Sequence, residues 1–214
     1  MANKNNDFEK RTFSFDIRAE ERETGETILT GRPIVYEQMT DIGYFNEIIA
    51  RGALDGANLK DVRFLVNHNT DMIPLARSRR NNGNSTMKFS IDEEGLYLDF
   101  VKLDVENNAD ARALWSAVKR GDISGMSFMF VVDKDEWDYT DEEHPTRRIL
   151  QIGSVIEVSA CTFPAYDDTE INARSLATLE KARAAMEIAK RQKATAPDGA
   201  DILALLKAKI NLLY

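Results

Sequence analysis

SGMSFMFVV, residues 124–132, is the stretch of this sequence that decides the fold class. Its large apolar side chains alternate with other residues, which places on one face Met126, Phe128, Phe130 and Val132. Strict alternation over a short run is the pattern of a β-strand with one buried face. We therefore predict a strand over these residues, with the hydroxyl of Ser127 on the other face.

Short runs of a similar kind occur on both sides of this stretch and predict further strands. They cover residues 12–18, 27–36, 63–67, 87–91, 96–103 and 149–162, the last as one strand or as two strands broken near Gly153. The polar run around Gly25 is typical of a hairpin turn. Pro33 limits its strand to a sheet edge or a bulge, because proline cannot donate a ladder hydrogen bond.

Helices are predicted at two places within this β-rich region. A short helix covers residues 45–54, with Asn46 at its N-cap. A longer one covers residues 108–120, where an asparagine precedes the helix, apolar residues recur at helical spacing, and Gly121 follows as a C-cap. The acidic segment 133–146 contains a proline and is interpreted as a loop.

The composition changes near residue 172, where Ala, Lys, Arg and Glu begin to dominate and favour helix. A linker rich in Pro and Gly covers residues 194–200, and an amphipathic helix is predicted after it. We therefore expect a disordered leader (1–10), a β-rich domain (11–170) and a helical extension (171–214). The predicted fold class is α+β, dominated by β-structure.

Composition and charge exclude several classes of function. The chain has 214 residues and a net charge of −8, which disfavours general binding to nucleic acid, since phosphate contacts depend on Lys and Arg. Cys161 is the one cysteine, so no intramolecular disulfide is expected, and a reducing compartment fits. The polar N-terminus and the absence of a long apolar run predict neither a signal peptide nor a membrane span. No spacing typical of a metal, dinucleotide or nucleotide site occurs, so we predict no metal and no cofactor.

Three residues carry the chemistry most worth testing. His68 directly follows a predicted strand, where its ring could reach a cleft, although a surface histidine is the simpler interpretation. Ser127 is a candidate nucleophile that needs a neighbouring base, or else an ordinary strand serine. Glu157 sits inside an apolar strand, where a carboxylate is costly unless paired. It could orient a catalytic histidine or act as a solubility charge at a sheet edge.

Three other residues compete for these roles. Ser124 lies three positions before Ser127 and is an alternative nucleophile. His144 lies in the acidic segment and is a second candidate histidine, although a solvated loop histidine is the simpler interpretation. Cys161 could also be a nucleophile, but a single cysteine in an apolar strand is more typically buried.

Five segments, taken in order, resemble one family. They are GYFNEIIARGAL (43–54), VNH (66–68), LAR (75–77), GDISGMSFMF (121–130) and EVSACTFPAY (157–166). Together they resemble the prohead maturation proteases of tailed bacteriophages, serine proteases related in fold to the herpesvirus assemblins. The resemblance covers roughly residues 12–170.

This resemblance implies roles for the candidate residues. The family nucleophile matches Ser127 and its base matches His68, while Glu157 is our choice for the acid. Because the assemblins use a second histidine in the third position, His144 remains an alternative. The family pattern has glycine where this chain has Met129, a change that could narrow the cleft but removes no catalytic side chain.

The resemblance also implies a fold and a setting. We expect a small β-barrel, closed or partly open, with flanking helices, as in the assemblins. The implied function is cleavage of a scaffold protein, or of the scaffolding segment of the major capsid protein, and then of the protease itself. Such a protease would act in the host cytoplasm inside the assembling prohead, with a homodimer or larger assembly left open. The helical extension would target it to a helical scaffold, with self-cleavage in or beside residues 172–214.

Two rival functions remain from the sequence. A non-catalytic capsid-assembly or scaffold protein could keep the fold and use the same helical tail. An esterase-like hydrolase would normally place its serine in a G-x-S-x-G turn between strand and helix. Ser127 instead lies within a strand pattern, and Met129 stands where that motif needs glycine.

Overall fold

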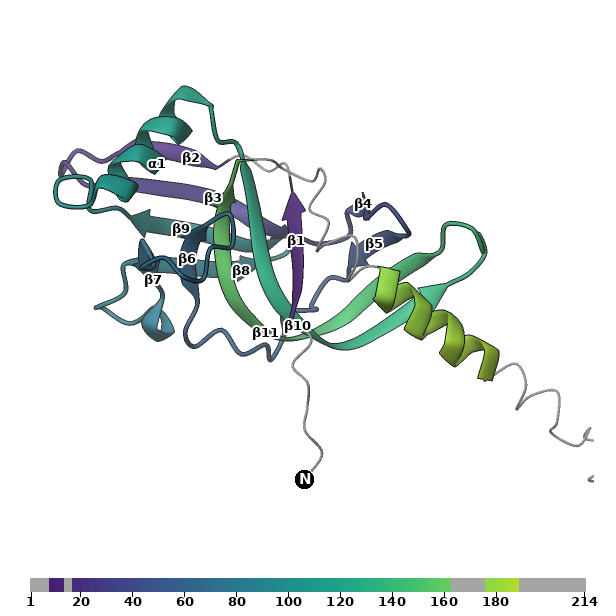
Figure 1. Ribbon diagram of the computed structural model, residues 1–214. Coiled ribbons are helices and arrows are strands. Elements are labelled where there is room, and N and C mark those ends of the chain that lie inside the picture. Colours follow the sequence, from purple (N-terminus) through teal and green to yellow (C-terminus); the bar gives the residue numbers. More distant parts are fainter. Residues whose placement is uncertain (1–7, 14–16, 163–175, 189–214) are drawn as a thin grey trace, which may run out of the picture. The chain divides into compact units, whose positions relative to one another are not determined.

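The structure is a computed structural model that describes residues 8–13, 17–162 and 176–188. It divides into two units, Met1–Ser175 and Leu176–Tyr214. The first contains two β-sheets and one longer helix (Figure 1). In the second, residues 176–188 are helical, within the segment for which helix is predicted. The predicted linker and last helix lie outside the described residues.

A four-stranded antiparallel sheet is built from two hairpins. Its order is β2 (Arg18–Glu21), β3 (Thr27–Val35), β9 (Gly95–Lys102) and β8 (Met87–Asp92). The hairpin predicted around Gly25 is confirmed, and β8 and β9 form a second hairpin. Of the two positions predicted for Pro33, a sheet edge or a bulge, the structure has the second kind, because β3 lies between β2 and β9 and its register against β9 shifts between Gly31 and Ile34. Gly95 is required where it stands, because a Cβ there would lie 2.0 Å from the carbonyl oxygen of Ile34.

A seven-stranded sheet forms around one long hairpin. Five strands follow the order β1 (Glu9–Phe13), β10 (Gly125–Asp138), β11 (Thr146–Cys161), β5 (Asn46–Ile49) and β4 (Met39–Asp41). The other two are β6 (Arg63–Val66), which pairs in parallel with β11, and β7 (Ala76–Arg77), which pairs with β6. The free edge of β11 thus pairs first with β5 and then with β6.

The hairpin of β10 and β11 is longer than the sequence predicts. The interpretation of residues 133–146 as a loop is wrong over half of its length, since β10 continues to Asp138 and β11 begins at Thr146. Their outer halves pair by backbone hydrogen bonds despite an acidic sequence, and four register shifts adjust the ladder. β11 also runs unbroken through Gly153. A Cβ atom on Gly153 would lie 2.5 Å from Asp133 Oδ1, so glycine leaves the space that the Asp133 carboxyl group occupies.

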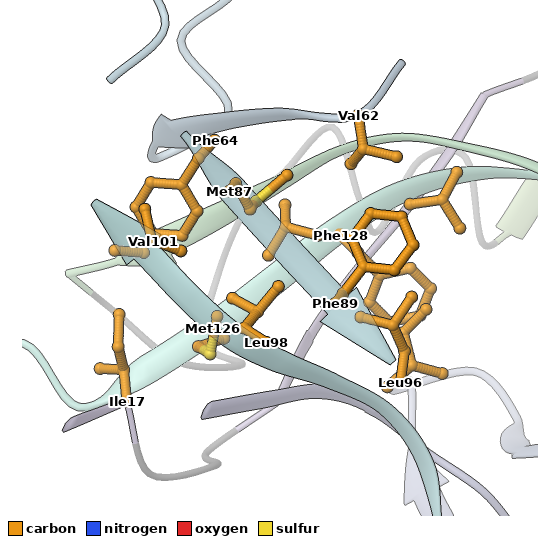
Figure 2. Packing of buried hydrophobic residues seen from close by; sticks show 14 of the residues in the cluster. Ile17, Val62, Phe64, Met87, Phe89, Leu96, Leu98, Val101, Met126 and Phe128 are labelled. Atoms are coloured by element: carbon orange, nitrogen blue, oxygen red, sulfur yellow. The ribbon is translucent and has the colours of Figure 1, made fainter. Parts of the chain in front are cut away.

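One hydrophobic core joins the two sheets. Phe128 and Met126 of β10 lie among apolar residues of β8, β9 and β6, as Figure 2 shows for Met87, Phe89, Leu98 and Phe64. The alternation predicted for residues 124–132 is therefore confirmed, because its apolar face is the one that packs against the second sheet. Both sheets bury their apolar faces against each other, as packed sheets do.

The main helix, α1 (Ala109–Arg120), packs on β2 and β3. The side chain of Asn108 accepts hydrogen bonds from the backbone N–H groups of Asp110 and Ala111. Gly121 follows in the left-handed conformation, with φ of 81°. The predicted helix and both of its caps are confirmed. A short 3₁₀ turn, η1 (Arg79–Asn81), lies between β7 and β8.

Further sequence predictions about the fold are corrected. The strands do not close into the expected barrel. Among the described residues, no β-ladder hydrogen bonds join the two sheets, which are held together by packing of their shared core. Residues 45–54 form strand β5 followed by turns rather than a helix, since parallel pairing with β11 satisfies this backbone. The single strand expected at 12–18 is two strands in different sheets, β1 and β2. β1 begins at Glu9, within the segment predicted as leader.

Candidate active site

The period of two along β10 and β11 gathers polar side chains on one face of the hairpin. Ser127 pairs directly with Ser159, and Met129 pairs with Glu157. Ser127 and Ser159 therefore point to the same face, and Glu157, two residues before Ser159, joins them there. Phe128 and Val158 point the other way, into the core.

His68 is held above this face by the end of β6. Asn67 and His68 both have left-handed backbone conformations, with φ of 50° and 55°, and asparagine and histidine adopt that conformation more readily than most residues. The Asn67 side chain clamps the end of β11, donating to Thr162 Oγ1 at 2.9 Å and accepting from the Thr162 backbone N–H at 2.9 Å. This sharp bend turns the His68 ring back across β11.

The structure brings His68, Ser127 and Glu157 into one chain of contacts. The Nδ1 atom of His68 hydrogen-bonds with Glu157 Oε1, and its Nε2 atom lies 2.6 Å from Ser127 Oγ. An ionised carboxylate can only accept, so it selects the tautomer with a proton on Nδ1 and leaves the Nε2 lone pair facing the hydroxyl. The Ser127 side chain is fully buried, and Glu157 is 1% exposed. This arrangement can activate a serine as a nucleophile.

Ser159 is a part of this group that the sequence analysis missed. Its hydroxyl donates to Glu157 Oε2 at 2.5 Å and accepts from the backbone N–H of His68 at 3.1 Å. It therefore holds both the carboxylate and the histidine backbone in place. The spacing of Ser159 two residues after Glu157 could have indicated a shared face, but not which loop lies above it.

The Ser127 hydroxyl has a second neighbour, the main chain of β1. Its Oγ donates to the carbonyl oxygen of Arg11 at 2.6 Å. β1 adds to the edge of β10 as an antiparallel strand, with Arg11 opposite Phe128 and Thr12 opposite Ser127. A hydroxyl has one proton, so the Arg11 carbonyl and the His68 ring compete for it. No signal in the sequence indicates this pairing of residues more than a hundred positions apart.

The side chain of Arg11 enters a buried cluster of charges. It contacts Glu47 through two bonds, Nε to Oε1 at 2.5 Å and Nη2 to Oε2 at 2.7 Å, and also contacts Glu9. Arg147 contacts both Glu9 and Glu47, and reaches Asp135 as well. Arg11, Glu47 and Arg147 are each less than 5% exposed.

These contacts change the acidity of the clustered groups. Burial by itself would raise the pKa of Glu9, but Arg11 and Arg147 outweigh burial and lower it. Burial by itself would lower the pKa of Arg11, but Glu47 and Glu9 outweigh burial and raise it. The charged forms of Glu9 and Arg11 are therefore the stable ones, as expected for buried groups that are paired.

The competing candidates lie elsewhere. Ser124 is exposed just before β10 begins, and Cys161 is buried at the end of β11. His144 lies in the turn beyond the far ends of β10 and β11, where its Nε2 atom is 3.4 Å from Asp41 Oδ1. The structure does not bring His144 to Ser127. Within the described ranges, no group of three or more His, Cys, Asp or Glu side chains is placed to hold a metal ion. No helix in the described part of the chain is long and apolar enough to cross a membrane.

A serine that contacts a histidine, which in turn contacts a carboxylate, is the geometry by which serine hydrolases are recognised. Comparison with protein families gives the narrower assignment. The family model described as caudovirus prohead serine protease matches residues 13–182, so the chain belongs to that family. Neither the curated proteins nor the solved structures give a significant match. Family membership assigns this protein a peptidase role in phage prohead maturation.

Proposed function

We propose that this chain is a serine endopeptidase in which Ser127 is the nucleophile, His68 the general base and Glu157 the acid that orients the histidine. Ser127 Oγ attacks the carbonyl carbon of the scissile bond while its proton passes to His68 Nε2. His68 then protonates the leaving amine, and water hydrolyses the ester on Ser127. Glu157 keeps the Nδ1 tautomer in place and stabilises the imidazolium.

The observation that carries this proposal is the chain of contacts from Ser127 through His68 to Glu157. The three residues come from three different strands or strand ends, so no local structural need accounts for their meeting. Burying a glutamate also costs free energy unless its oxygens are satisfied, and here both oxygens are bonded, one to His68 and one to Ser159.

We propose three substrates: a scaffold protein, the scaffolding segment of the capsid protein, and the protease itself. Cleavage takes place inside the prohead, in the host cytoplasm. The family description supports a role in the prohead but names no substrate. The helical extension of residues 171–214 is proposed to dock the enzyme on its scaffold, with a self-cleavage site in or beside it. Most of that extension lies outside the described residues.

Intact mass measured over time tests the proposal. Wild-type chain and Ser127→Ala are each incubated with the phage capsid and scaffold proteins. Wild type should produce fragments, and Ser127→Ala should lower the rate by about 10⁴-fold or more. Ser124→Ala is the matched control, because it removes an exposed serine three residues away, and it should behave as wild type.

The same experiment separates the rival function. A non-catalytic assembly protein would leave every partner and itself uncut, with wild type and Ser127→Ala giving identical masses. Fragments that also appear with Ser127→Ala would show that Ser127 is not the nucleophile.

A further inference from the structure

We propose that β1 occupies the substrate position of this site, and that the enzyme cuts its own Arg11–Thr12 bond, with Glu47 selecting a basic residue before the cut. This inference rests on the proposed function, because it requires Ser127 to be the nucleophile. It adds a substrate class, a specificity-determining residue and a second place of self-cleavage, at the N-terminus.

The main chain of β1 is placed as a peptide substrate would be. Extended peptides commonly bind by adding a strand to a free sheet edge, where backbone hydrogen bonds hold them and side-chain pockets select them. β1 adds in this way to β10, the strand that carries Ser127. The Arg11 carbonyl oxygen lies 2.6 Å from Ser127 Oγ, so the Arg11 peptide group lies against the proposed nucleophile.

The Arg11 side chain is recognised as a substrate side chain would be. The Glu47 carboxylate meets its guanidinium through two parallel contacts in a buried setting, which is the geometry that distinguishes arginine from neutral residues. Without β1, the remaining charges are the buried Glu47 and Arg147 and the partly exposed Asp135, whose summed charge is negative. Such a pocket favours a cation before the cut bond.

A second side chain of β1 fits the same scheme. Glu9, two residues before Arg11, meets Arg147 through two contacts, at 2.6 and 2.9 Å. Arg147 therefore favours an acidic residue two positions before the basic one. The segment Glu9-Lys10-Arg11 matches both preferences.

Most of β1 precedes the range of the family match. The match begins at residue 13, so Glu9 to Thr12 lie before it. The proposed catalytic residues all lie within the matched range.

The chemical step is an ordinary hydrolysis. Ser127 Oγ bonds to the carbonyl carbon of Arg11, the C–N bond to Thr12 breaks, and His68 delivers the serine proton to the Thr12 amine. Water then attacks the ester, giving a carboxylate on Arg11 and restoring Ser127. The products are a peptide of residues 1–11 and a chain that begins at Thr12.

Mass spectrometry of the full chain tests this directly. Purified wild type should lose residues 1–11 over time, while Ser127→Ala should keep them. Arg11→Lys should still be cut at this bond, whereas Arg11→Gln should be cut about a hundredfold more slowly, because buried Glu47 would lose its two contacts with Arg11 and keep only its single contact with Arg147. Lys10→Gln is the matched control, since it removes a neighbouring cation of the same strand and should be cut at the wild-type rate.

A second measurement varies the substrate, so that residue 11 of the enzyme itself is not substituted. Wild-type enzyme is mixed with peptides of residues 7–16 in which position 11 is Arg, Lys, Gln or Glu. Cleavage after Arg and Lys should exceed cleavage after Gln or Glu by about a hundredfold. In the enzyme, Glu47→Gln should remove that preference, whereas Glu37→Gln, an exposed carboxylate that pairs with Arg148, should leave it unchanged.

The outcomes distinguish this inference from the function on which it rests. If wild type cuts capsid or scaffold proteins but keeps residues 1–11, and its cuts follow no basic residue, the inference is overturned and the proposed function stands. Equal cutting of the Arg and Gln peptides would likewise overturn it. If no partner, peptide or chain is cut, both fail together.

Discussion

Ser159 shows how much of the candidate site depends on a residue that performs no chemistry itself. Its hydroxyl joins two parts of the site, the carboxylate of Glu157 and the backbone of His68. Because Glu157 is buried, a carboxylate oxygen left without a hydrogen bond would cost free energy. Ser159 is therefore a positioning residue.

Replacing Ser159 with alanine should lower kcat by about 10- to 100-fold, by analogy with other supporting residues of active sites, with little change in KM. The reason is that the histidine loses its fixed orientation while the edge of β10, which we propose holds the substrate, is unchanged. Steady-state kinetics on a cleavable peptide would measure the split, and Ser159→Thr, which keeps the hydroxyl, should restore much of the rate. If Ser159→Ala lowers the free energy of unfolding but leaves kcat unchanged, the role of Ser159 is purely structural.

Helix α1 shows, at the scale of one element, how well local rules apply to this chain. Its start, its end and its buried face follow from an asparagine cap, a glycine in the left-handed region, and apolar residues at helical spacing. None of these features depends on the distant sheet. For that reason the sequence predicts this element correctly.

Asn108→Ala should lower the free energy of unfolding by about 1 kcal/mol, because two N–H groups at the start of α1 lose their acceptor. Urea unfolding measures the change, and peptidase activity should stay the same, since α1 packs on β2 and β3 rather than on the site strands. Asn84→Ala, in an exposed turn, is the control and should have little effect. A change equal in both variants would argue against the cap.

The element scale also shows where local rules fail. Residues 45–54 carry a plausible helix cap, yet the segment is a strand and turns, because β11 offers a parallel partner for its backbone. The acidic composition of residues 133–146 suggested a loop, yet pairing along the long hairpin outweighs composition. In both cases a strand distant in sequence decided the structure. The tendency of a segment to form a β-strand depends on its neighbours more than the tendency to form a helix does.

At the scale of the whole molecule, the buried charges link β1 to the rest of the seven-stranded sheet. The pKa of Glu9 is lowered in the folded protein because Arg11 and Arg147 outweigh the effect of burial. A lowered carboxyl pKa contributes stability that is fully present above the value in the unfolded chain, near 4.5. That stability is lost as the pH falls through the lower value of the folded state.

The expected result is that acid selectively weakens this link. On a Ser127→Ala background, which prevents cleavage, the urea midpoint should fall below about pH 4.5 more steeply with Glu9 present than in Glu9→Gln. Unfolding curves at a series of pH values would measure the difference. Parallel curves for the two chains would show that Glu9 does not couple the charge cluster to stability.

Local patterns in the sequence predict the β-dominated class, the strand that carries Ser127, helix α1, and the residues His68, Ser127 and Glu157 as candidates. Alternation, helix caps and ordered motifs are local, so they can be recognised along the chain. Other features become visible only in the folded chain: the sheets do not close into a barrel, Ser159 supports Glu157, and β1 lies against Ser127 with Arg11 on Glu47. Those features depend on register between strands far apart in sequence, where a shift of one residue would turn every side chain to the other face.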